Sequence, residues 1–153
     1  ILLKINGLGD FLVNLFMIAM LPALAEELMF RGGVQRAFKR MFNNPHVAIW
    51  LAAFIFSAIH LQFYGFLPRL LLGALFGYIY LWTGNLWYAI LAHFLNNAYA
   101  VCVAWYLQLK NIPLSNVEAS FSFAWYGYLI SFVMAAYLLI YIKNKSTYGK
   151  QLG

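Results

Sequence analysis

Charge is what this chain of 153 residues has least of: Asp, Glu, Lys and Arg together make up 9% of it, whereas hydrophobic residues make up 65% and aromatic residues 20%. A soluble domain carries about 25% charged residues, so the composition excludes a soluble enzyme and a disordered tail. Cys102 is the only cysteine, which excludes an internal disulfide and a zinc cluster of thiolates. The sequence therefore predicts a protein whose main solvent is the lipid bilayer.

Five long apolar runs occupy most of the chain. Each is close to the roughly 20 residues that cross about 30 Å of hydrocarbon, and in lipid the backbone polar groups must be satisfied within a helix. The runs cover approximately residues 11–30 (continuing into a basic stretch that ends near Met41), 46–61, 66–82, 86–107 and 121–142. We expect an all-α, polytopic transmembrane helix bundle of about five spanning helices. Residues 1–153 are expected to form one membrane-embedded unit, a portion of a longer chain.

The basic residues behind the net charge of +6 lie at the ends of the apolar runs. Short loops rich in Lys and Arg stay on the cytoplasmic side of a membrane. The cluster after the first run contains Arg31, Arg36, Lys39 and Arg40, the cluster after the fifth contains Lys143, Lys145 and Lys150, and Lys4, Arg69 and Lys110 fall on the other face. The pattern predicts that both clusters face the cytoplasm.

Two adjacent acidic residues, Glu26 and Glu27, lie late in the first apolar run. A carboxylate at the bilayer centre costs at least about 2.5–3.5 kcal/mol, so such residues usually face a cavity and serve a function. Arg31 follows Glu27 by one helical turn, in the order that favours an ion pair. We therefore predict that Glu27 pairs with Arg31 and that Glu26 is available for chemistry. The alternative is that both glutamates lie in the interfacial layer at the helix end.

Two histidines lie in or at the end of other apolar runs. His60 ends the second run, and His93 lies one turn before Asn97 on the same face of the fourth. One histidine in an apolar helix is more often a packing residue than a catalyst. Two histidines on separate helices, together with an aligned asparagine and the pair of glutamates, instead indicate a group of residues with a shared function. His46 is expected in a loop, without a role. At 1.5 Å per residue Glu26 and His93 lie roughly 10 Å, and His60 roughly 20 Å, from the cytoplasmic ends of their helices. Either helix tilt or a second helix that starts further out in the interface would bring the three residues to the same depth.

Three short motifs occur in order on separate helices. Residues 26–31 (EELMFR) resemble the EExxxR motif of the CPBP family of intramembrane proteases, which includes the CAAX prenyl endopeptidases. Residues 56–60 (FSAIH) are similar to the FxxxH element of that family, and residues 93–97 (HFLNN) to its HxxxN element. The resemblance covers roughly residues 22–100. Each motif alone is weak, but three in order within an apolar chain are specific.

The resemblance implies an endopeptidase that hydrolyses a peptide bond near the cytoplasmic membrane surface. The implied catalytic residues are Glu26, His60, His93 and Asn97, with Glu27 and Arg31 in support. The first two would hold and activate a water molecule, and the next two would donate hydrogen bonds to the oxyanion on the scissile carbonyl. The implied partners are a peptide or membrane-protein substrate and the lipid bilayer, without nucleic acid. A chain this compact resembles the bacterial members, which favours the bacterial inner (cytoplasmic) membrane.

No cofactor is expected, although zinc is an alternative. Glu26, His60 and His93 could form a three-ligand zinc site with an exchangeable water. We favour the metal-free reading, because no HExxH motif is present and a zinc-bound Glu26 would leave no separate general base. The alternative function is a non-proteolytic membrane protein that binds a partner or confers self-immunity to a bacteriocin. A proton or ion pathway ranks last, because polar groups do not continue through the outer half of the bundle.

Overall fold

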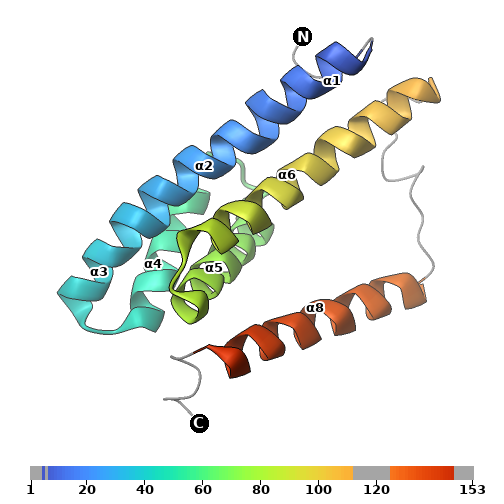
Figure 1. The fold of residues 1–153 in the computed structure, drawn as a ribbon. Helices are drawn as coiled ribbons and strands as arrows, with labels where there is room; N and C mark the ends of the chain where they lie inside the picture. Colours follow the sequence, from blue (N-terminus) through green and yellow to red (C-terminus); the bar gives the residue numbers. More distant parts are fainter. Residues whose placement is uncertain (1–4, 6, 112–124, 147–153) are drawn as a thin grey trace.

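The computed structural model describes residues 5, 7–111 and 125–146. In this part of the chain every regular element is a helix, which confirms the predicted all-α class (Figure 1). The elements are a long N-terminal helix, the helical pair α4 (Pro45–Ala58) and α5 (Phe66–Thr83), a second long helix α6 (Leu86–Leu109) and a C-terminal helix α8 (Trp125–Lys145). Helix α6 runs beside the N-terminal helix, and α5 contacts α4, α6 and α8.

The N-terminal helix is continuous over 35 residues, Leu8–Phe42. Its segments are α1 (Leu8–Asn14), the π-helical η1 (Leu15–Met20), α2 (Leu21–Glu27), the π-helical η2 (Leu28–Val34) and α3 (Gln35–Phe42). This agrees with the predicted apolar run and its basic extension. π-Helical turns inside α-helices are rare and occur frequently at functional sites, and η2 begins directly after the two adjacent glutamates.

The remaining helices are α4 (Pro45–Ala58), α5 (Phe66–Thr83), α6 (Leu86–Leu109) and α8 (Trp125–Lys145). The side chain of Asn44 caps α4 by accepting hydrogen bonds from two backbone N–H groups, and that of Asn85 caps α6 by accepting one. His46 lies in the first turn of α4 and not in a loop, because the helix begins at Pro45. Gly84 adopts a positive φ of 66° in the turn between α5 and α6.

Three helices of the described chain are long and apolar enough to cross a membrane: Leu8–Phe42, α5 and α6. The second predicted span, residues 46–61, is the shorter apolar helix α4 of 14 residues. At 1.5 Å per residue α4 is about 21 Å long, less than the roughly 30 Å of hydrocarbon. Helix α8 occupies most of the fifth predicted span. The first residues of that span, 121–124, lie outside the described residues.

Small residues allow α4 and α5 to pack closely. A Cβ added to Gly73 would lie 3.2 Å from Cβ of Ala53, and one added to Gly77 would lie 2.9 Å from Cγ2 of Ile49. Close approach through small residues is the usual way in which helices associate in lipid. The contact holds the backbone of α5 near the N-terminal helix, where its carbonyl groups accept hydrogen bonds from that helix.

Candidate active site

A cavity of about 400 Å³ lies between α2, the end of α4, α5 and α6. Glu26, His60, His93 and Asn97 all line it, so the four residues expected to be catalytic come together from three different helical regions. The other polar side chains at its wall are Arg69 and Asn96. The apolar part of the wall includes Phe56, Leu72 and Phe76.

The length of the first helix brings His60 level with Glu26. The helix continues to Phe42, and α4 starts after a short turn at Pro45. At 1.5 Å per residue Glu26 lies about 24 Å from Phe42, and His60 lies about 22 Å from Pro45. The two residues therefore lie at similar distances from the turn between their helices, because the first helix extends to Phe42 and α4 starts at Pro45.

Glu27 is the centre of a buried ionic network. Its Oε1 atom lies 2.9 Å from Nη1 of Arg31 and 2.8 Å from Nδ1 of His93. The exposed fractions are 0% for Glu27, 2% for Arg31 and 5% for His93. The predicted Glu27–Arg31 ion pair is present. The contact with His93 was not predicted, because it joins helices that are distant in the sequence.

Arg31 links this network to α5. Its Nη2 atom donates a hydrogen bond of 2.7 Å to the backbone carbonyl of Gly73. The guanidinium lies 5.4 Å from the ring centre of Phe56 and 5.7 Å from that of Phe76, within the range of cation–π attraction. The ring of Phe76 also stacks on that of His93, with 5.0 Å between ring centres. These contacts fix both partners of Glu27.

Glu26 has a different environment from its neighbour. Its side chain is 29% exposed, and its Oε2 atom lies 3.7 Å from Nε2 of His93, too far for a hydrogen bond. Adjacent residues of a helix point about 100° apart, so Glu26 borders the cavity while Glu27 is buried behind it. His93 contacts both, with one ring nitrogen toward each glutamate.

Hydrogen bonds define the free atoms of His60 and Asn97. Nδ1 of His60 lies 2.7 Å from the carbonyl oxygen of Phe56. A carbonyl oxygen only accepts, so Nδ1 carries a proton, and in the neutral imidazole Nε2 is the nitrogen with the lone pair. Oδ1 of Asn97 accepts a hydrogen bond of 3.3 Å from Nδ2 of Asn96, which leaves the amide N–H groups of Asn97 for another acceptor.

The metal alternative concerns Glu26, His60 and His93. Within the described residues no group of three or more His, Cys, Asp or Glu side chains is arranged to hold a metal ion. One ring nitrogen of each histidine has a protein partner, the backbone of Phe56 for His60 and Glu27 for His93. Metal-binding histidines have the same kind of partner on the nitrogen that does not bind the metal, so these two contacts do not distinguish the alternatives. The three side chains border one cavity.

Two polar residues of the cavity were not identified from the sequence. Asn96 precedes Asn97 and donates to it, so its position beside a candidate residue was a usable signal. Arg69 was counted only as a charge that flanks an apolar run. Arg69 lies in the first turn of an apolar helix, nine residues after His60. Nothing in the sequence indicates that such a residue borders the same cavity as His60.

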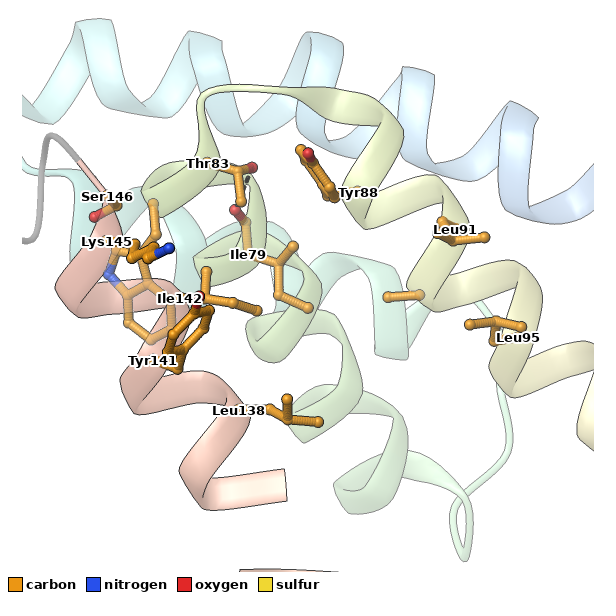
Figure 2. Close-up of a pocket in the computed structure, with 12 residues that line it drawn as sticks. Ile79, Thr83, Tyr88, Leu91, Leu95, Leu138, Tyr141, Ile142, Lys145 and Ser146 are labelled. Atoms are coloured by element: carbon orange, nitrogen blue, oxygen red, sulfur yellow. Dashed lines mark hydrogen bonds between the residues drawn. The ribbon is translucent and has the colours of Figure 1, made fainter. Parts of the chain in front are cut away.

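A second cavity, of about 640 Å³, lies between α5, α6 and α8 (Figure 2). Its wall is mainly aliphatic and aromatic, with Leu91 and Leu95 of α6 facing Leu138 and Tyr141 of α8. Lys145 is at one end. The cavity is larger than the first, but none of the predicted site residues lines it, so it does not carry the candidate chemistry.

Comparison with known proteins agrees with the motifs. Residues 8–99, which include all the predicted site residues, match the family model described as type II CAAX prenyl endopeptidase Rce1-like. The chain is also 32% identical over 93 residues to "Uncharacterized protein YpbD" of Bacillus subtilis (strain 168). The aligned part is 58% of this chain and 44% of that protein, so the chain spans less than half of this relative. No solved structure gives a significant match. The chain belongs to the Rce1-like family of type II CAAX prenyl endopeptidases.

Proposed function

We propose that residues 1–153 form the core of an intramembrane endopeptidase, which hydrolyses a peptide bond near the cytoplasmic surface of a bacterial inner membrane. Membership of the family supports the general function of a CAAX-type membrane protease. The observation that carries the proposal is the single cavity lined by Glu26, His60, His93 and Asn97. Peptide hydrolysis needs a general base, a group that orients the water, and hydrogen-bond donors for the oxyanion, and the side chains at this cavity can supply all three.

Glu26 is the general base. Its carboxylate takes one proton from a water molecule, and Nε2 of His60 accepts a hydrogen bond from the other O–H of the same water and orients it. The resulting hydroxide attacks the scissile carbonyl carbon. Glu26 then gives its proton to the departing amide nitrogen as the C–N bond breaks. The partial exposure of the Glu26 side chain, 29%, is consistent with access to water and substrate.

His93 and Asn97 stabilise the negative charge on the carbonyl oxygen in the tetrahedral intermediate. Nδ1 of His93 lies 2.8 Å from Oε1 of Glu27, so Nε2 is the ring nitrogen that is left to interact with the oxyanion. Nε2 also lies 3.7 Å from Oε2 of Glu26, on the side of the cavity. Asn97 contributes a neutral N–H donor. Glu27 and Arg31 act by holding His93 in place.

We propose that the reaction proceeds without a metal ion, with zinc on Glu26, His60 and His93 as the alternative. No group of three or more His, Cys, Asp or Glu side chains in the described part of the chain is arranged to hold a metal ion. The metal-free version also leaves Glu26 free to act as the base, whereas zinc coordination would occupy it.

The test is cleavage of a peptide library by the purified protein in detergent or nanodiscs. We expect Glu26→Ala to abolish cleavage. The control is Asp10→Ala, which removes a carboxylate from α1, outside the cavity, and should keep full activity. Equal cleavage by wild type and Glu26→Ala would refute the proposal. A cellular phenotype that survives Glu26→Gln would favour the alternative, a non-proteolytic partner-binding or bacteriocin-immunity protein.

A further inference from the structure

Arg69 borders the candidate active site and has no role in the mechanism above. It lies in the first turn of α5 and lines the same cavity of about 400 Å³ as Glu26 and His93. It is the one lysine or arginine among the described residues that line this cavity. The cavity therefore contains a carboxylate from α2 and a permanent cation from α5.

The guanidinium of Arg69 is held in place but not neutralised. Nη2 donates a hydrogen bond of 2.6 Å to Oε1 of Gln62. The guanidinium also lies against Gly65, where an added Cβ would be 3.1 Å from Nη2. Nη1 is buried and has no hydrogen-bond partner within the described chain. No carboxylate of the described residues forms an ion pair with Arg69, so its positive charge is uncompensated beside the cavity.

The ligand chemistry follows from the planar fork of the guanidinium. This group binds carboxylates through two parallel hydrogen bonds. Arg69 and Glu26 line the same cavity of about 400 Å³, so a carboxylate bound at Arg69 would belong to the peptide whose bond is attacked beside Glu26.

We propose that Arg69 is a specificity-determining residue that binds a carboxylate of the substrate in the same cavity as the scissile bond. The carboxylate is either the free C-terminus of the substrate or an Asp or Glu side chain. The inference rests on the proposed function, because it assigns the cavity to a peptide. It does not require turnover, so it can be tested by binding alone.

The experiment measures binding of fluorescent nine-residue peptides of leucine and alanine to Glu26→Gln, a variant that removes the proposed base. Three peptides are compared: one with a free C-terminal carboxylate, one with a C-terminal amide, and an amide with a glutamate near its end. We expect one of the two anionic peptides to bind about 10–100-fold more tightly than the neutral amide. A preference for the free carboxylate identifies the C-terminus, and one for the glutamate peptide identifies a side chain.

Adding Arg69→Gln should remove this preference, and Arg69→Lys should keep part of it, because lysine retains the charge without the fork. Arg40→Gln is the matched control: it removes the same charge from an exposed position of α3 and should leave the preference unchanged. A thermal unfolding curve for each variant verifies that it is folded. Equal binding of the three peptides, binding of none of them, or an unchanged preference in both Arg69 variants would overturn the inference. The proposed function is judged separately, by cleavage with wild type and Glu26→Ala.

Discussion

Glu26 and Glu27 are identical in chemistry and adjacent in sequence, yet replacement by glutamine should affect them in opposite ways. Glu27 is 0% exposed and is the buried counter-ion of Arg31 and a hydrogen-bond acceptor for His93. Glu27→Gln leaves the guanidinium of Arg31, only 2% exposed, without its counter-ion. Breaking a buried ion pair by removal of one partner costs about 3–5 kcal/mol. We expect Glu27→Gln to lower the free energy of unfolding by that amount.

Glu26→Gln makes the same change one residue earlier, where no buried ion pair is lost. The nearest basic atom to its carboxylate is Nε2 of His93 at 3.7 Å, and the side chain is 29% exposed. We expect the free energy of unfolding to change by less than about 1 kcal/mol. Turnover should fall by about 10²–10⁴-fold, the contribution of a general base.

The two variants are compared by thermal unfolding and by peptide cleavage in one detergent. For a chain of about 150 residues each kcal/mol shifts Tm by about 2–4 °C, so Glu27→Gln should lower Tm by about 6–20 °C. The double variant Glu27→Gln/Arg31→Gln should lose less than the sum of the two single variants, because it leaves no uncompensated buried charge. Equal Tm values for the two glutamate variants would refute the assignment of Glu27 to the network and of Glu26 to the cavity.

Three further predictions address the oxyanion donors, the helix contact and the metal. Asn97→Ala should lower kcat by about 10²–10³-fold with little change in KM. Asn96→Ala removes only the donor to Asn97 and should lower kcat by less; equal decreases in kcat for the two variants would contradict the role of Asn97. Gly77→Ala should destabilise the protein by about 1–3 kcal/mol, because its Cβ would meet Ile49 at 2.9 Å, whereas Gly33→Ala, with open space around it, should be neutral or stabilising in the same unfolding assay. EDTA should leave cleavage unchanged; a loss of activity that added zinc restores would favour the zinc alternative.

The sequence predicted those features that depend on neighbouring residues of one helix or on polar groups that cost free energy in an apolar helix. The apolar runs predicted the helices because each must satisfy its own backbone in lipid. The Glu27–Arg31 ion pair was predictable because residues four apart in a helix are neighbours, and it is present at 2.9 Å. The candidate cavity residues were predictable because polar groups are costly in an apolar helix. Their catalytic roles stay predictions.

Contacts between helices that are distant in the sequence could not be predicted, because they depend on how the helices pack. The hydrogen bond between His93 and Glu27 joins α6 to α2, and no local pattern encodes which ring nitrogen faces which glutamate. The position of Arg69 was missed for a related reason. A charge in the first turn of an apolar helix is ordinarily a solvated flank, and only the packing of α4 and α5 brings it to the cavity. The short length of α4 was missed because its apolar run continues beyond the helix.

The register of the first helix decides which glutamate becomes structural. The residue one turn after Glu27 is Arg31, whereas the residue one turn after Glu26 is Phe30, which is 1% exposed and packs edge-on against Phe56 with 5.1 Å between ring centres. Glu27 therefore finds its counter-ion on its own helix and is buried with it. Glu26 has only an apolar neighbour at that spacing, and its side chain, 29% exposed, borders the cavity. The position of Arg31 four residues after Glu27 is therefore the local sequence feature that distinguishes the two glutamates.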